Sequence, residues 1–517
     1  MKPIHEARAL AASVMLAFGL PAAASAAPAS APAAAAEVFE PAAVRADLSQ
    51  LYALLRQSHY DLYARAPRRG YDALFDRLIA GIRTPLSKAR TALLFQRFLA
   101  HGKIAHARVE GASAGYDTYL AKDGAVFPLR IRVKRGSVFV ARNSSGVAGI
   151  AAGDELVSLN GERIARWLER GAAYLSADTP YMAHAMMEWD FPTLLWWQLG
   201  AVEAFDVVVR KPDGARRAFR LPALTRSEMT AAAKLQPPEL DLGWTGRTAR
   251  MLDDRIAYLR PGPFYNAEGG EELMYDNRAF TAFIDGAFRD FLAAGATALV
   301  IDLRNNPGGD NSFSDRMIAW FATRPFRFSS RFRIRVSPAS TASNRRRLAN
   351  ARNDPTGITA RLAAAYAAAK PGEIIDFEIP PATPRAGPRF EAPVYLLINR
   401  HSYSNPVSAA ALVQDYGFGT IIGEETSDLA TTYGAMESFT LPRTGLVVGY
   451  PKALIIRPSG SMRARGVVPD IRLEVPVVEG PRDPVLADAV RAVRAKGEVP
   501  GARRKKRNLA DPASPSR

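Results

Sequence analysis

A serine at a predicted strand–helix junction is the residue of this sequence best suited to nucleophilic chemistry. Ser404 follows an apolar run at 394–398, which is typical of a buried strand in an α/β core. Asn405 is a good N-cap and Pro406 suits the first helical position, so a helix is predicted over 407–416. Backbone N–H groups at a helix N-terminus favour negative charge, so this junction suits both a nucleophile and the donors that hold an oxyanion. A serine that only shapes the turn is the alternative.

A second apolar run, at 298–301, leads into another sharp turn. The sequence that follows reads Asp302-Leu-Arg-Asn-Asn-Pro-Gly-Gly309. The two glycines permit a tight bend whose backbone comes close to its neighbour. We expect Asp302 and Arg304 to fix this turn, and contact between Arg304 and a substrate carboxylate is the alternative.

Taken in order, these motifs resemble the peptidase core of the C-terminal processing peptidases and the tricorn protease. The resemblance rests on the 302–309 turn, on Gln414-Asp415-Tyr416 and on Gly423-Glu-Glu-Thr426, and it extends over residues 37–495. Alignment on Gln414-Asp415-Tyr416 places the nucleophile of the family at Ser404, and not at Ser402 or Ser408. The resemblance implies a serine-type peptidase with a Clp-protease/crotonase-like core in an α/β (α+β multidomain) chain.

A histidine far from Ser404 in the sequence is the candidate base. His106 ends the segment His-Gly-Lys-Ile-Ala-His, which follows a predicted helix. In tricorn-like members of the resembled family this position supplies the base, so the resemblance implies that His106 accepts the proton of Ser404. A histidine with only a structural role is the alternative.

The resemblance also implies an oxyanion site made of backbone N–H groups. The N–H of Asn405 and one from Gly308 or Gly309 would face the carbonyl oxygen of the substrate. No metal and no cofactor are expected, because the chain has no cysteine and its histidines are few and scattered.

The sequence departs from the family pattern at the third catalytic member. Dyad enzymes of the family place a lysine where this chain has Leu429, and the late glutamate of the tricorn-like triad falls in the segment 459–465, which has arginines and no carboxylate. Asp428 and Glu437 are candidate substitutes to orient His106. Loss of the orienting acid weakens a serine–histidine pair without abolishing it. A catalytically silent peptide- or lipid-binding protein on the same fold is therefore the alternative function.

Composition and periodicity divide the chain into segments. Residues 1–26 look like a secretory signal, with a basic start, a short apolar stretch and the small residues Ala24-Ser25-Ala26, and an uncleaved N-terminal anchor is the alternative. The expected order is then a linker at 27–36, a helical N-terminal domain at 37–119, a PDZ-like domain at 120–225, a linker at 226–249, the peptidase core at 250–500 and a disordered basic tail at 501–517.

The PDZ-like assignment rests on the segment 149–161, which resembles the turn–strand–turn of PDZ domains. A hairpin is predicted around Asp213-Gly214, and alternation at 127–133 predicts a half-buried strand. PDZ folds bind extended peptides by strand addition, so this module is a candidate for substrate capture. An insert at 179–199, rich in methionine and tryptophan, is expected to be a packing helix, with an apolar substrate rim as the alternative.

Composition excludes several function classes. The chain of 517 residues has 48% hydrophobic and 23% charged residues, no cysteine and a formal charge of +17. The positive charge would attract anionic envelope surfaces, or simply belongs to a solvated arginine-rich surface. No basic stripe with interleaved aromatics suggests nucleic-acid binding, and no run after the signal is long enough to span a membrane. The sequence thus predicts a periplasmic or secreted bacterial serine endopeptidase that acts on peptide or protein substrates.

Overall fold

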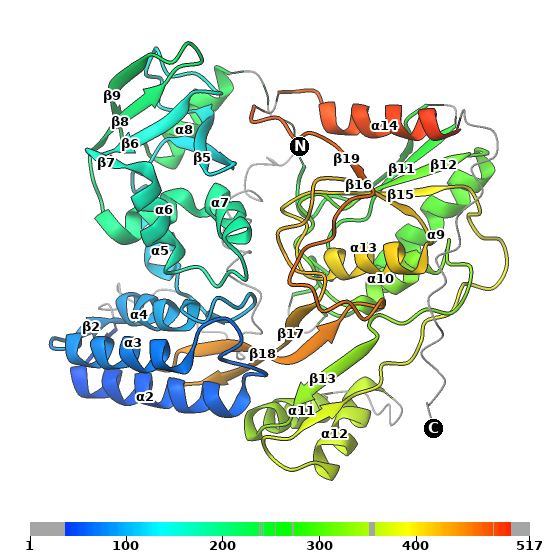
Figure 1. Cartoon of the computed structure of the whole chain (residues 1–517), viewed down its shortest axis with the longest axis horizontal. Coiled ribbons are helices and arrows are strands. Elements are labelled where there is room, and N and C mark those ends of the chain that lie inside the picture. The colour runs from blue at the N-terminus through cyan, green and yellow to red at the C-terminus, as the bar shows by residue number, and fades with distance from the viewer. Residues whose placement is uncertain are drawn as a thin grey trace, which may run out of the picture.

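The computed structural model describes residues 37–497 except 237, 239, 241, 254, 271–272, 351–356 and 479. The predicted signal at 1–26, the linker at 27–36 and the basic tail at 501–517 lie outside these residues. Figure 1 shows a stack of N-terminal helices at the lower left, a β module above them and a larger α/β core on the right.

The core is built on a six-stranded sheet in the order β10-β11-β12-β15-β16-β19, in which only the pair β10–β11 is antiparallel. Alternate residues of each strand face opposite hydrophobic clusters: Leu299 and Ile301 face one, and Ala298 and Val300 face the other. Both faces are therefore covered, as the continuous apolar sequences predict. The strands are β10 (Thr248–Met251), β11 (Ile256–Arg260), β12 (Ala298–Asp302), β15 (Val394–Ile398), β16 (Thr420–Gly423) and β19 (Ile471–Arg472).

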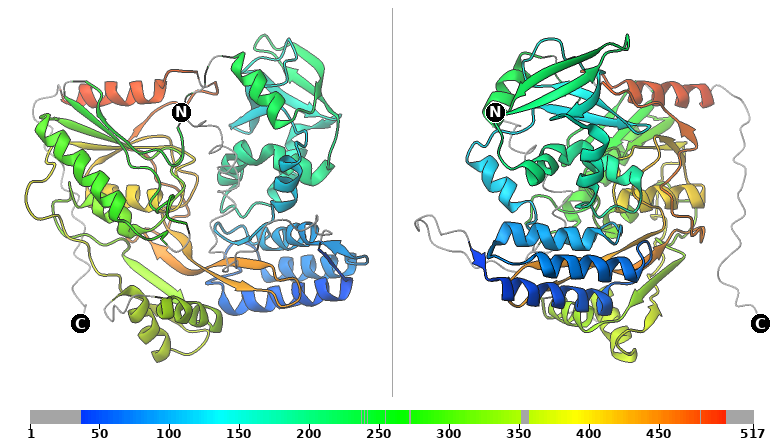
Figure 2. Two further views of the ribbon diagram at one scale, coloured as in Figure 1. Left: turned by 180° about the vertical axis from the view of Figure 1, so that it is seen from behind. Right: turned by 60° about the vertical axis from the view of Figure 1, so that its left-hand side comes forward.

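Helices cover both faces of this sheet. The helices α9 (Arg278–Ala293), α10 (Asn311–Ile318) and α13 (Asn405–Tyr416) pack on one face. The helix α14 (Pro484–Gly497) packs on the other, which can be followed in Figure 2. Because β12 and β15 are parallel neighbours, the turns at their carboxyl ends meet at one edge of the sheet.

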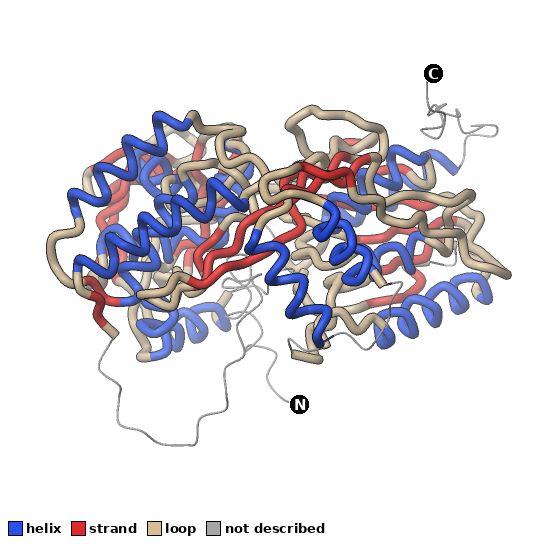
Figure 3. The backbone as a smooth tube through the Cα atoms, turned by 90° about the horizontal axis from the view of Figure 1, so that it is seen from below, coloured by secondary structure: helices blue, strands red, loops and turns tan. Residues whose placement is uncertain are grey.

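A second sheet links the core to the N-terminal helices. Its order is β14-β13-β18-β17, and the short strand β3 (Arg108–Val109) joins the edge of β18. Figure 3 shows strands running between the helical stack and the core. The strands are β13 (Arg331–Arg335), β14 (Ile374–Asp376), β17 (Thr432–Thr440) and β18 (Val447–Ile456), and α11 (Pro338–Asn350) and α12 (Ile358–Ala368) lie beside them.

The N-terminal region is helical, as predicted. The helices α2 (Pro41–Ser58), α3 (Arg68–Gly81) and α4 (Lys88–Ala100) share a buried cluster with Val448 and Tyr450 of β18. This region also contains α5 (Ala114–Ala121) and a two-stranded sheet of β1 (Val38–Phe39) and β2 (Leu86–Ser87). The helices therefore dock on the long β17–β18 hairpin through hydrophobic contacts.

The β module contains the predicted hairpin, formed by β8 (Ala204–Arg210) and β9 (Arg216–Pro222). The methionine- and tryptophan-rich insert forms α7 (Pro180–Leu199), ten residues of which are buried, so it packs as a core helix. The helix α8 (Arg226–Lys234) occupies the start of the predicted 226–249 linker. The other elements are β4 (Leu129–Lys134), β5 (Ser137–Asn143), β6 (Glu155–Leu159), β7 (Glu162–Arg163) and α6 (Ile164–Ala172).

A buried carboxylate fastens α2 to the turn of the β17–β18 hairpin. Asp47 is fully buried and accepts hydrogen bonds from the N–H groups of Arg443 and Thr444 and from the Thr444 hydroxyl. Asp47→Ala should lower the free energy of unfolding by about 3 kcal/mol, because these donors would stay buried without an acceptor. Urea denaturation of the purified chain measures this loss. The exposed Asp76→Ala is the matched control, and an equal effect in both variants would contradict the docking role.

Candidate active site

Ser404 lies at the tip of the turn between β15 and α13, in a strained backbone conformation. Its φ and ψ are 63° and −117°, a combination rare for residues other than glycine. Ser404 is itself the N-cap of α13, so the prediction of Asn405 as the cap is wrong by one residue; the sharp turn at Ser404 lets the helix begin at Asn405. A serine with only a capping role would accept a bond from the second or third helical N–H. In the described structure the Ser404 side chain makes no such bond, so its hydroxyl is available for chemistry.

The glycine turn after β12 packs directly against Ser404. A Cβ atom added to Gly308 would lie 2.9 Å from the Cβ of Ser404, and one added to Gly309 would lie 2.0 Å from the carbonyl oxygen of Phe264. Both glycines also have positive φ, 116° and 133°. The sharp, close turn predicted for these residues is therefore present, and only glycine fits both positions.

The three backbone donors predicted for the oxyanion site differ in what they bind. The Gly308 N–H donates to Oδ1 of Asn306 at 3.1 Å. The N–H groups of Gly309 and Asn405 make no hydrogen bond within the described part of the chain. Gly308 therefore shapes the turn, and Gly309 and Asn405 remain as the donors open to a ligand.

Hydrogen bonds tie the two turns together. The Tyr403 N–H donates to the carbonyl oxygen of Asn306 at 3.0 Å. Ser402 is fully buried, and its hydroxyl donates to the carbonyl oxygen of Leu303 at 2.8 Å. Ser402 therefore has a structural role, which agrees with the register that selects Ser404.

Arg304 fixes the turn and does not face a substrate. It is buried, and its guanidinium donates to the carboxylates of Asp302 and Asp483. Burial alone would raise the pKa of Asp302, but Arg304 and Arg260 outweigh it and lower that pKa to about 2. Asp302 is thus a permanent anion that holds Arg304 in place.

His106 reaches this site because β3 joins the edge of β18. Val109, three residues after His106, pairs with Val448 of β18. The imidazole of His106 packs on the ring of Tyr403, with ring centroids 4.8 Å apart. His106 has a positive φ of 68°, and its buried Nδ1 has no partner among the described residues.

The structure places His106 beside the turn that carries Ser404, but no hydrogen bond joins the two side chains in the described residues. Catalytic hydrogen bonds are often long without substrate and shorten in the complex. Their proximity is therefore consistent with a base that engages Ser404 when a substrate is bound.

The surroundings of His106 predict its pH dependence. Burial lowers its pKa from 6.5 to about 4, Asp178 opposes this shift, and Arg108 adds to it. A base must be neutral to accept a proton, so a hydrolase that uses His106 as its base should stay active well below pH 6.5 and lose activity only near pH 4. The rate of labelling by a fluorophosphonate, measured from pH 4 to 8, tests this. Burial raises the pKa of Asp428 to about 6, so a fall near pH 6 that disappears in Asp428→Asn would assign the profile to Asp428 instead.

Neither carboxylate named from the sequence contacts the His106 imidazole in the described structure. Asp428 accepts the N–H of Ser404 at 2.6 Å and that of Leu429 at 2.8 Å, so it supports the nucleophile turn. Glu437 is buried and paired with Arg347 and Lys452. Leu429, where the dyad lysine would lie, is buried and apolar.

A carboxylate that the sequence did not single out lies next to His106. Asp178 accepts the N–H of Ala105, the residue before His106, at 3.2 Å. It belongs to the β module and precedes the predicted insert, and no local pattern marks it as part of a site. Only the tertiary structure shows this neighbour.

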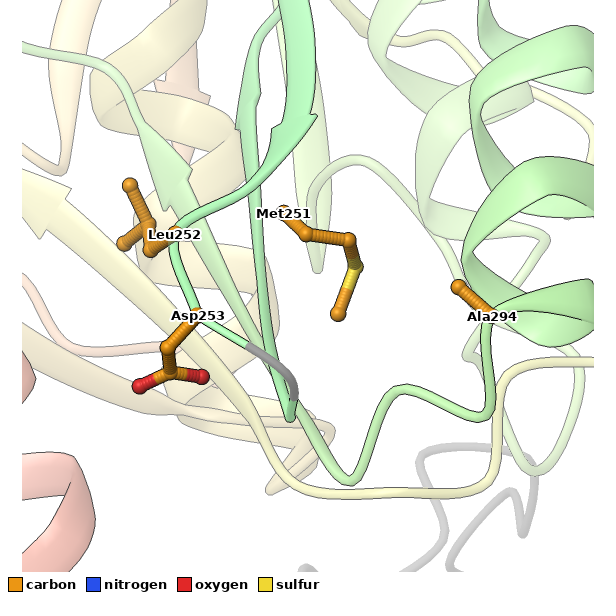
Figure 4. Close-up of a pocket in the computed structure, with 4 residues that line it drawn as sticks. All are labelled: Met251, Leu252, Asp253 and Ala294. Atoms are coloured by element: carbon orange, nitrogen blue, oxygen red, sulfur yellow. The ribbon is translucent and has the colours of Figure 1, made fainter.

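A cavity elsewhere in the core lies apart from these residues. It is lined by Met251, Leu252, Asp253 and Ala294, shown in Figure 4. Met251 ends β10, and the other lining residues directly follow β10 or α9, at the amino end of the parallel strands, whereas Ser404 lies at the carboxyl end. Asp253, its only ionisable lining residue, is paired with Arg494. The cavity therefore lies at the opposite edge of the sheet from Ser404.

Among the described residues, no cluster of three His, Cys, Asp or Glu side chains is arranged to hold a metal ion. In that same part of the chain, no helix is long and apolar enough to cross a membrane.

The comparison with family models supports a serine-type peptidase. Residues 256–473 match the family model of peptidase family S41. Comparison with curated protein sequences found no match.

Solved structures share the fold over most of the chain. The structure of mature CPAF complexed with lactacystin aligns with a TM-score of 0.57 and 16% identity, over 88% of this chain and 97% of that chain. Mature CPAF aligns with a TM-score of 0.53 and 17% identity, over 84% of this chain and 93% of that chain. The photosystem II D1 C-terminal processing protease aligns with a TM-score of 0.42 and 16% identity, over 84% of this chain and 95% of that chain. At these identities the likeness concerns the fold alone.

Proposed function

We propose that this chain is an exported serine endopeptidase in which Ser404 is the nucleophile and His106 is the general base. One observation carries the proposal: the Ser404 hydroxyl is free of any capping role and stands in a strained turn against Gly308. Serine peptidases use a serine hydroxyl of this kind for covalent catalysis. Export is supported by the predicted signal at 1–26.

The proposed reaction follows from the positions of these groups. The Ser404 Oγ attacks the carbonyl carbon of the scissile bond while His106 accepts its proton. The N–H groups of Gly309 and Asn405 donate to the developing oxyanion. His106 then gives the proton to the leaving amine, which leaves an acyl-enzyme on Ser404. Water attacks this ester with His106 again as base, which releases the product acid and restores the Ser404 hydroxyl.

Substrate capture by the β module remains part of the proposal. A PDZ-like sheet would hold an extended peptide by strand addition, and the substrate would be a peptide or protein. Attraction of the positively charged chain to anionic envelope surfaces would concentrate it near such substrates.

A catalytically silent binding protein on the same fold is the second candidate. It is favoured by a specific observation: no described carboxylate or lysine bonds to the His106 imidazole or to the Ser404 hydroxyl.

Labelling with a fluorophosphonate separates the two functions, because the probe requires an activated serine. The purified chain without residues 1–26 is treated with the probe and digested, and the modified residue is identified by mass spectrometry. Modification at Ser404, together with hydrolysis of casein, supports the peptidase. A folded chain that is neither labelled nor hydrolytic supports the binding protein.

A further inference from the structure

We propose that Asp178 is the positioning residue of His106, so that the β module supplies the acid that this active site lacks in its core. This inference rests on the proposed function and concerns the same site. It assigns a role to the residue just before the N-cap of α7, one position before the predicted insert.

The geometry of Asp178 is that of a buried clamp. Its side chain is 1% exposed. One carboxylate oxygen accepts the Nε–H of Arg65 at 2.7 Å, and the other accepts the N–H of Ala105 at 3.2 Å. Because Ala105 precedes His106 in the chain, this second bond fixes the backbone that aims the imidazole.

Charge gives Asp178 a second effect on His106. When His106 takes the proton of Ser404 it becomes a cation in a buried site, and a nearby carboxylate stabilises that cation. Asp178 raises the pKa of His106, against burial and Arg108, which lower it. The other groups around the imidazole are the ring of Tyr403, which packs on it at a tilt, and the backbone of Tyr433. Asp428 is close enough to Asp178 to raise the pKa of that carboxyl.

The helix α7, which begins just after Asp178, also contacts the turn that carries Ser404. Glu188 of α7 binds Arg400 at 2.8 Å and His401 at 3.0 Å, and the Trp189 indole donates to Nδ1 of His401 at 2.8 Å. These partners lie three and four residues before Ser404. The α7 segment therefore holds the base at its start and the nucleophile turn near its middle, which keeps the two in register.

Two properties separate a positioning acid from a clamp that only stabilises the fold. A clamp affects stability and the amount of folded chain. A positioning acid also sets the pKa of His106 and the rate of the chemical step, with substrate affinity unchanged. The test therefore measures the pKa of His106 itself, which needs no turnover.

The first measurement is the titration of His106 by NMR in chains with labelled histidine, with its signals assigned by their loss in His106→Asn. Asp178→Asn should move the titration midpoint to lower pH, because it removes the negative charge. Arg65→Met should move it in the same direction, because burial raises the pKa of Asp178 and Arg65 opposes that rise, so the variant favours the neutral carboxyl. Asp190→Asn, which replaces a buried carboxylate on α7, is the control and should leave the midpoint unchanged. An unmoved midpoint in both Asp178→Asn and Arg65→Met would overturn the proposal.

The second measurement is peptide hydrolysis by the same variants. Asp178→Asn should lower kcat at least about a hundredfold with KM within twofold, and Asp190→Asn should keep both. An unchanged kcat in a wild type that hydrolyses peptides would also overturn the positioning role. If the wild type neither hydrolyses nor reacts with a fluorophosphonate, the proposed function fails, and the NMR titration still decides whether Asp178 controls His106.

Discussion

Ser404→Ala is expected to lower peptide hydrolysis by about six orders of magnitude and to abolish fluorophosphonate labelling. The variant removes the only atom that forms the acyl-enzyme in the proposed reaction. It should fold normally, since alanine keeps the Cβ atom that already fits against Gly308, and the Ser404 N–H still donates to Asp428. Casein and peptide turnover, together with thermal unfolding, measure both parts of this expectation.

Ser408→Ala is the matched control for this experiment. Ser408 lies on the first turn of α13, is partly exposed and takes no part in the proposed chemistry. It should keep the activity and the labelling of the wild type. Full turnover by Ser404→Ala, or loss of labelling only in Ser408→Ala, would show that the nucleophile is misassigned.

The core strands could be predicted because their signal is local. Residues 298–301 and 394–398 are continuous apolar runs, and the structure places them in β12 and β15, buried on both faces. Element ends were less predictable. The helix α10 begins at Asn311 because the Asp310 side chain accepts the Ser312 N–H and caps the helix, a contact that apolar periodicity does not reveal.

The site was only partly predictable, for a physical reason. The glycine turn and Ser404 lie in short motifs whose backbone demands are legible in the sequence. The approach of His106 depends on β3, a strand of two residues that pairs with β18 and has no periodicity of its own. Asp178 approaches His106 only through the packing of the β module on the N-terminal helices.

Electrostatics show the same limit. From the sequence, His106 has the usual pKa of a histidine, near 6.5. In the fold, burial lowers that pKa to about 4. Burial also raises the pKa of Asp428 to about 6. These shifts depend on neighbours far apart in the chain, which no local motif specifies.

His106→Asn is expected to lower kcat by about four to six orders of magnitude, since without a base the Ser404 hydroxyl is a weak nucleophile. Asparagine is chosen because His106 has a φ of 68°, and asparagine tolerates this conformation better than alanine does. The effect therefore reports the imidazole and not backbone strain. The control is His101→Asn. His101 lies five residues before His106 and packs on Tyr71, so this variant should retain activity.

The double variant Ser404→Ala/His106→Asn makes this prediction sharper. If the two residues act as one unit, removing both should cost no more than removing Ser404 alone, because the base has no function without its nucleophile. If His106 only supports the fold, the losses should multiply, as they do for independent sites. Multiplying losses, or a single His106→Asn variant within tenfold of the wild-type kcat, would remove His106 from the mechanism and leave Ser404 to be activated by another group.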